Sequence, residues 1–266
     1  MNPEWLVAYA LLGSVVGFLA GLLGVGGGAV MVPVLTSLFA AQGFHREHLV
    51  HMALGTAMAT IVVTSISSLR AHHAHGAVRW DIVRGIAPGI LIGTFGGTFL
   101  SSRVPSVPLA LFFVLFTALV AYRMLRAARP HPTQALPGAL GLALVGVGIG
   151  FVSALVAIGG GSLSVPFMTR CNVPIQIAVG TSAAIGFPIA LAGAMGYLFN
   201  GWGITGLPEH SLGFVYWPAL VSISAVSVLT APLGARLAHR MPVAALKRVF
   251  AGLLLLLSAK MLHTLL

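Results

Sequence analysis

The sequence is very poor in charge, and acidic residues are nearly absent. Of its 266 residues only 7% are charged, whereas an ordinary soluble domain carries about 25%. The acidic residues are Glu4, Glu47, Asp81 and Glu209. A chain with so little charge cannot cover a water-facing surface with polar groups, which excludes the usual soluble globular class. With 58% hydrophobic residues and a mean hydropathy of +1.02, the composition indicates an integral membrane protein.

Cysteine is almost absent as well. Cys171 is the single cysteine, so the chain can form no internal disulfide and has no thiol motif for metal or redox chemistry. The ten histidines include two clusters: His45, His48 and His51, and His72, His73 and His75. No carboxylate or thiol pattern accompanies them, so we interpret them as solvated faces that flank membrane spans, with proton handling by His51 as an alternative. We expect no metal and no cofactor.

The apolar runs contain neither Asp nor Glu. Cation-coupled carriers often place a carboxylate inside the membrane, so its absence favours an anion as substrate. We find no set of nucleophile, base and orienting group either, and expect no enzyme activity. The formal net charge is +10, but the basic residues lie between apolar runs, as in cytoplasmic loops. We therefore expect a lipid bilayer and a small anion as partners, and no nucleic acid.

Continuous apolar runs fill most of the chain, which favours helices over a membrane barrel. The first, Trp5–Leu23, has no Lys or Arg ahead of it, so we expect a membrane span rather than a signal peptide. Two runs, 30–41 and 163–168, are too short to span alone, and each closely follows a triple glycine. The fold class is therefore an all-α integral membrane protein with two interrupted segments.

The sequence repeats itself. Gly26–Gly28 and Pro33 match Gly159–Gly161 and Pro166 at one constant offset, and Ala53–Ala57 matches Ala178–Ser182. Ordered matches at glycine and proline are hard to obtain by chance from apolar sequence. We predict one integral membrane domain made of two homologous repeats, residues 1–130 and 131–266.

The basic loops predict how the repeats are oriented. The loop Asn200–Gly213 has no Lys or Arg and is placed outside, whereas the mid-chain connection 126–137 is basic and is placed inside. Both placements hold if each triple glycine breaks a hairpin that crosses an even number of times. Each repeat is then a broken hairpin plus three transmembrane helices, and the repeats are inverted, a common transporter plan. The alternative is eight simple spans with parallel halves.

The broken segments predict a binding site. Opened backbone in a membrane must find partners inside the protein or in a cavity, and helix N-termini that point into a cavity bind anions through free N–H groups. Ser162 and Ser164 add hydroxyl donors after the second break. Close helix packing on small residues is the alternative interpretation for one triple glycine, and two at matching places favour a site. Thr56 and Thr181 recur after each break and are expected to close the cavity from opposite sides.

These paired motifs, GLLGVGGGAVMVPVL and ALVAIGGGSLSVPFM, each followed by an A-x-G-T segment, resemble the TauE/SafE family of sulfite exporters and related permeases over essentially the whole chain. The resemblance implies an inner-membrane permease for sulfur oxyanions or organosulfonates such as sulfite, sulfoacetate and taurine-related compounds. Two departures stand out: Ala57 replaces the serine found at Ser182, and Ala157 replaces the glycine found at Gly24.

We therefore expect a secondary transporter of small anions that works by alternating access. An anion channel-like pore is the nearest alternative, and a non-transport membrane subunit or enzyme is the alternative from another class. Transport direction, oligomeric state and coupling ion, for which a proton is one candidate, are left open. The candidate substrate-binding residues are Gly26, Gly27, Gly28, Pro33, Thr56, Gly159, Gly160, Gly161, Ser162, Pro166, Thr181 and Ser182.

Overall fold

The computed structural model describes residues 3–23, 27–125, 135–238 and 243–265, and nearly all of them are helical. In the first half, α1 (Pro3–Leu23) and the short α2 (Gly28–Ala41) flank the first triple glycine. They are followed by α3 (Leu49–Ala74), α4 (Trp80–Ser101) and α5 (Ser106–Leu125). A broken hairpin is thus followed by three long helices, as the sequence predicts.

The second half repeats this order. α6 (Ala139–Val156) and the short α7 (Gly161–Arg170) flank the second triple glycine, and α8 (Ile175–Asn200), α9 (Trp217–Ala238) and α10 (Val243–Leu265) follow. A two-stranded hairpin of β1 (Ser211–Leu212) and β2 (Val215–Tyr216), which the sequence does not predict, lies between α8 and α9. The boundary between residues 130 and 131 lies outside the described residues.

The outer surface of the bundle is apolar. Seven helices of the described part of the chain are long and apolar enough to cross a membrane, namely α1, α3, α4, α5, α6, α8 and α9. Large side chains such as Ile92, Leu115, Leu140 and Leu229 are more than two-thirds exposed. Such a surface would be unfavourable in water and suits contact with lipid tails.

The helices α3 and α8 form the centre of the bundle. The most apolar windows of α3 and α8 are 78% and 67% buried, whereas that of α5 is 33% buried. The two helices run antiparallel, because Gly55 of α3 lies beside Tyr197 of α8, and Ser65 lies beside Gly186. Any path through the middle of the bundle therefore follows these two helices.

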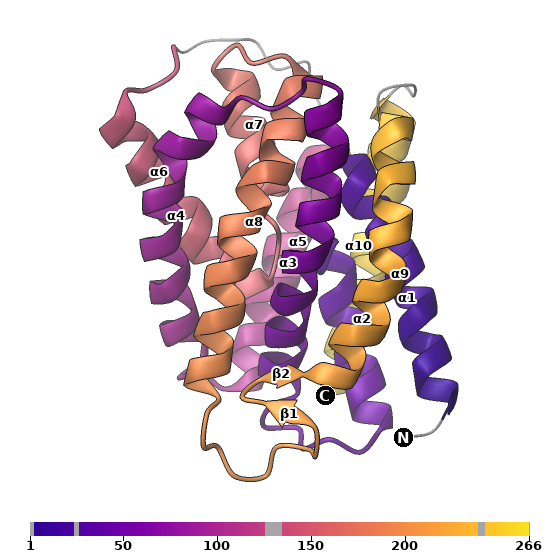
Figure 1. The fold of residues 1–266 in the computed structure, drawn as a ribbon. Helices are drawn as coiled ribbons and strands as arrows, with labels where there is room; N and C mark the ends of the chain where they lie inside the picture. Colours follow the sequence, from indigo (N-terminus) through magenta and orange to yellow (C-terminus); the bar gives the residue numbers. More distant parts are fainter. Residues whose placement is uncertain (1–2, 24–26, 126–134, 239–242, 266) are drawn as a thin grey trace.

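The two halves interleave rather than stand side by side (Figure 1). The first hairpin helix of each half packs along the fourth helix of the other half, so that α1 lies on α9 and α6 lies on α4. Glycines make these approaches possible: a Cβ on Gly21 would lie 1.9 Å from the Ala231 carbonyl oxygen, and one on Gly89 would lie 1.8 Å from that of Ala143. Both termini and the β-hairpin lie at one end of the bundle, and α7 lies toward the other (Figure 1).

Candidate functional site

Each triple glycine ends one helix and starts another through a left-handed residue. Gly27 precedes α2 with φ of 72°, and Gly160 precedes α7 with φ of 80°. Side chains are strained in this conformation, and glycine is not, so the middle glycine of each triplet is required by the backbone. Ala157 adopts φ of 46° at the end of α6, which supplies a second left-handed residue at the second break. Gly26 lies outside the described residues.

The two breaks meet. A Cβ on Gly28 would lie only 1.7 Å from the Ala157 carbonyl oxygen, so the start of α2 packs directly on the end of α6. No other residue than glycine fits this contact without a backbone shift. The sequence predicts that the two broken segments converge, and the structure brings Gly28 and Ala157 into contact.

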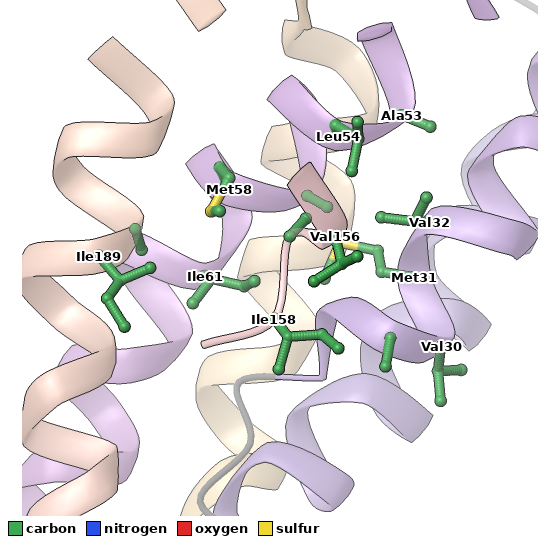
Figure 2. Packing of buried hydrophobic residues seen from close by; sticks show 14 of the residues in the cluster. Val30, Met31, Val32, Ala53, Leu54, Met58, Ile61, Val156, Ile158 and Ile189 are labelled. Atoms are coloured by element: carbon green, nitrogen blue, oxygen red, sulfur yellow. The ribbon is translucent and has the colours of Figure 1, made fainter. Parts of the chain in front are cut away.

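The central helices complete the surroundings of this junction. Ile61 of α3 approaches Gly28, and Ile189 of α8 approaches Gly160. Figure 2 labels both isoleucines within the buried apolar cluster. Gly186 of α8 faces the carbonyl oxygen of Gly159. The side chains around the junction are small or apolar, so its polar groups are chiefly backbone N–H and C=O groups at the helix ends.

Two hydroxyls at the start of α7 have no hydrogen-bond partner in the described part of the chain. The Oγ atoms of Ser162 and Ser164 are inaccessible to solvent and form no hydrogen bond with the described residues. A buried hydroxyl without a partner is unfavourable unless a water or ligand binds it. Ser182, on α8, is fully buried and already has a polar interaction. The second break therefore offers two hydroxyls that the fold itself does not use.

The two candidate threonines hold loops. The Oγ1 atom of Thr56 accepts a hydrogen bond of 3.0 Å from the backbone N–H of Tyr216, just before α9. The Oγ1 atom of Thr181 accepts one of 3.0 Å from the backbone N–H of Arg79, just before α4. The two bonds correspond to each other in the predicted repeats, since each joins one central helix to the segment before the long helix that follows the other central helix. We call them the Thr56 latch and the Thr181 latch.

The latches lie at opposite ends of the bundle. Tyr197 lies beside Gly55, next to Thr56, and Thr181 lies about 24 Å from Tyr197 along the axis of α8 at 1.5 Å per residue. One small anion therefore cannot touch both threonines. The structure brings together the glycine breaks of the predicted site and places Thr56 and Thr181 on either side of them.

The two prolines of the motif lie inside the short helices. Pro33 is in α2 and is buried, and Pro166 is in α7. Proline has no N–H, so Pro33 and Pro166 leave the carbonyl oxygens four residues earlier, those of Ala29 and Ser162, without their helical donors. The prolines therefore shape α2 and α7 rather than present a polar group to the junction.

A buried row of polar side chains along α3 escaped the sequence analysis. Thr56, Thr60, Thr64, Ser68 and His72 recur at every fourth residue, and none is more than 2% exposed. This spacing places side chains along one ridge of a helix. The four-residue spacing is present in the sequence. Threonine and serine in membrane helices usually bond their own backbone, however, so the spacing alone does not indicate a polar path.

A second polar cluster lies at the end of the bundle that carries the β-hairpin. The Nε2 atom of His51 lies 3.1 Å from the Ser101 carbonyl oxygen and 3.0 Å from that of Val104, and its ring stacks on Phe214. Tyr197 donates to the Ala154 carbonyl oxygen at 2.9 Å. His51 thus joins α3 to the turn between α4 and α5. Among the described residues, no group of three or more His, Cys, Asp or Glu is arranged to hold a metal ion.

Comparison with known proteins agrees with this architecture. The family model described as "Sulfite exporter TauE/SafE" matches residues 9–261. The chain belongs to the TauE/SafE family. It is 36% identical over 252 residues to a probable membrane transporter protein of Haemophilus influenzae, covering 94% of this chain and 96% of the relative. No solved structure matches it.

Other relatives of this TauE/SafE protein carry similar names. The probable membrane transporter protein YunE of Bacillus subtilis is 28% identical over 73% of this chain and 79% of its own length. One from Methanocaldococcus jannaschii, MJ0441, is 27% identical over 84% of this chain and 80% of its own length. The prediction of a multi-pass membrane transporter rather than an enzyme is confirmed, and the inner membrane is the usual location of such proteins.

Proposed function

We propose that this transporter carries small sulfur-containing anions, such as sulfite or an organosulfonate, and binds them where the two glycine breaks meet. The observation that carries the proposal is the contact between Gly28, at the start of α2, and Ala157, three residues before the N-cap of α7, because it brings the beginnings of the two short helices near each other. Helix N-termini carry partial positive charge and unpaired N–H groups, which bind anions without a basic side chain. Such a site fits a core without Lys or Arg.

The hydroxyls of Ser162 and Ser164 support this assignment. Both lie in the first turn of α7, and neither has a partner among the described residues. Hydroxyls donate readily to sulfonate and sulfite oxygens, and a hydrogen bond to a charged group contributes about 1.5–3 kcal/mol. Gly161 begins α7 beside them, and Ser182 belongs to α8, the helix on which α7 packs.

We further propose that the two halves are inverted repeats and that access alternates. The equivalent pairs α1 with α9 and α6 with α4, and the equivalent latches at opposite ends, support a two-fold relation within the membrane plane. The Thr56 latch would hold the loop before α9 when the site faces the other end, and the Thr181 latch would do the same for the loop before α4. Release of one latch at a time would open one side only.

Thermal unfolding of the purified protein tests the site. A ligand that binds only the folded state raises the stability by about 2.7 kcal/mol at a concentration of 100 times Kd. We expect sulfite or sulfoacetate to raise the Tm, and chloride and a cationic control to leave it unchanged. Flux into proteoliposomes that does not saturate with anion concentration would favour the channel-like alternative.

The variant Gly160→Leu should remove the stabilisation by sulfite or sulfoacetate. Leucine at φ of 80° is strained, and its Cβ would lie 2.6 Å from Ile189 Cδ1. The matched control is Gly148→Leu in α6, where a Cβ meets nothing within 4 Å. Anion stabilisation that persists in a folded Gly160→Leu protein would reject the site.

A further inference from the structure

The row of polar side chains on α3 continues from the glycine junction to one end of the bundle. Ile61 contacts the first break, and Thr64, Ser68 and His72 follow on the same helix. Between Thr64 and His72 the row rises about 12 Å, in steps of about 6 Å. Beyond His72 the helix ends at Ala74, in the connection toward α4. The row therefore joins the proposed binding site to the membrane surface at that end.

The row is connected across helices and incompletely satisfied by the protein. The hydroxyls of Thr64 and Ser227 of α9 lie 2.8 Å apart, and both are fully buried. Ser68 is 2% exposed, and its Oγ has no hydrogen-bond partner among the described residues. A buried, unpartnered hydroxyl one helical turn from other polar groups is suited to bind a water molecule. Water between successive side chains would make the row continuous.

His72 ends the row as its only imidazole. It is fully buried, and its Nε2 atom lies 3.0 Å from the carbonyl oxygen of Gly21 in α1. A carbonyl oxygen only accepts, so Nε2 bears hydrogen and Nδ1 is the nitrogen that takes up a proton. Ionisable residues inside membrane helices are rare and mark proton relays in pumps and transporters.

Other charged groups are turned away from this row. The described parts of α2, α6 and α8 contain no Asp, Glu, Lys, Arg or His, and α1 carries only Glu4, at its opposite end. Exposed basic groups at this end are Arg70 and His73 of α3, His75 just after it, Arg123 of α5 and Arg236 of α9. Asp81, in the first turn of α4, pairs with Arg79. A proton on His72 adds positive charge to the row, which favours an anion nearby.

We propose that His72, Ser68, Thr64 and Ser227 form a proton path that couples proton movement to transport of the anion. The inference rests on the proposed function. His72 takes a proton from water at the membrane surface and becomes imidazolium. It passes the proton to the next water or hydroxyl, which releases one of its own toward the junction, and His72 returns to the neutral ring. A proton that travels with the anion offsets the cost of moving its charge through the bilayer.

Proteoliposomes test the coupling. Radiolabelled sulfoacetate is the first probe because its acidic groups stay ionised near neutral pH, so the substrate itself carries no proton; sulfite is the second. We expect a pH gradient alone to drive accumulation by the wild-type protein. The variants His72→Gln and Ser68→Ala should lose accumulation to the level of empty vesicles and retain exchange of internal for external anion, which also shows that they fold.

Thr117→Val is the matched control. Thr117 of α5 is also fully buried, bonds the carbonyl oxygen four residues earlier, and lies 2.8 Å from the hydroxyl of Ser258 in α10. The Thr117–Ser258 pair has the same interactions as the Thr64–Ser227 pair but lies outside the row. Thr64→Val should therefore impair proton-driven accumulation, and Thr117→Val should not.

Proton-driven accumulation that survives in both His72→Gln and Ser68→Ala would overturn the path. Anion transport by the wild-type protein that does not change with the pH gradient would also overturn the proton path, and it would leave the proposed function intact. Absence of any anion flux in the wild-type protein would overturn both.

Discussion

The central helices α3 and α8 are each the third helix of their half and occupy equivalent places in the proposed repeats, but they differ in chemistry. With Ala53–Ala57 aligned on Ala178–Ser182, Thr60 and Thr64 of α3 correspond to Ile185 and Ile189 of α8. With Gly97 of α4 aligned on Gly234 of α9, Ile90 corresponds to Ser227, so the partner helix differs in the same way. All are fully buried. One side of the bundle thus has buried hydroxyls where the other has buried isoleucines.

The ends of the two rows show what the repeat retains. His72 of α3 corresponds to Tyr197 of α8, and each bonds a backbone carbonyl oxygen, that of Gly21 or that of Ala154, which are themselves equivalent. The hydrogen bond to the carbonyl oxygen is retained, whereas the imidazole occurs on one side only. Helix packing therefore explains what the two halves share. A function that needs only one side, such as proton coupling, would depend on the residues that differ between them.

The contact between the two breaks should respond most strongly to substitution. In Gly28→Ala the new Cβ would lie 1.7 Å from the Ala157 carbonyl oxygen, so the two halves must separate at their junction. We expect a loss on the order of 3 kcal/mol or more in the free energy of unfolding. Thermal unfolding in detergent measures this. Gly148→Ala is the control and should be neutral or slightly stabilising, since its Cβ meets nothing. Equal Tm values for the two variants would contradict the contact.

The two latches should differ in strength although they are equivalent in the repeat. Thr56→Val leaves the backbone N–H of Tyr216 unpaired at a residue that is only 5% exposed, which costs about 1–3 kcal/mol. Thr181→Val frees the N–H of Arg79, an exposed residue, where water can replace the hydroxyl. We expect a cost below about 1 kcal/mol there. Unfolding of both variants under the same conditions gives the comparison, and a larger loss for Thr181→Val would reverse it.

Removal of the Tyr197 hydroxyl should have a smaller effect. Tyr197→Phe removes its bond to Ala154 and leaves Ser101, whose Oγ lies 2.8 Å away, without that partner. A loss of about 1 kcal/mol is expected. Because this position is the counterpart of His72, the variant should also keep pH-driven accumulation, which proteoliposomes can measure alongside the His72→Gln protein. Loss of coupling in Tyr197→Phe would place the proton path on the wrong side of the bundle.

Much of the architecture follows from the sequence, and the reason is visible in particular residues. Membrane spans require long apolar runs, and a backbone break requires glycine, so Gly27 and Gly160 could be found without a structure. The roles of Thr56 and Thr181 could not. Their partners are backbone N–H groups of Tyr216 and Arg79, which lie far away in the chain and carry no side-chain signal. The polar row of α3 can be found in the sequence as a four-residue spacing. Only its burial against α9 distinguishes it from hydroxyls that bond the carbonyl oxygens of their own helix.

The two breaks themselves differ in hydroxyls, and this difference should affect binding more than stability. Ser162 and Ser164 correspond to Ala29 and Met31 of the first break. Because neither hydroxyl has a partner among the described residues, Ser162→Ala and Ser164→Ala should change the free energy of unfolding by no more than about 0.5 kcal/mol, and removal of an unpaired buried group is neutral or stabilising. If they hold the anion, each variant should lose about tenfold or more in affinity, as expected for a hydrogen bond to a charged group. Thermal unfolding with and without sulfite or sulfoacetate measures both quantities in one experiment. An unchanged anion-dependent shift in the double variant would show that the backbone N–H groups bind alone, and a large loss of stability without anion would show that the hydroxyls belong to the packing of α7.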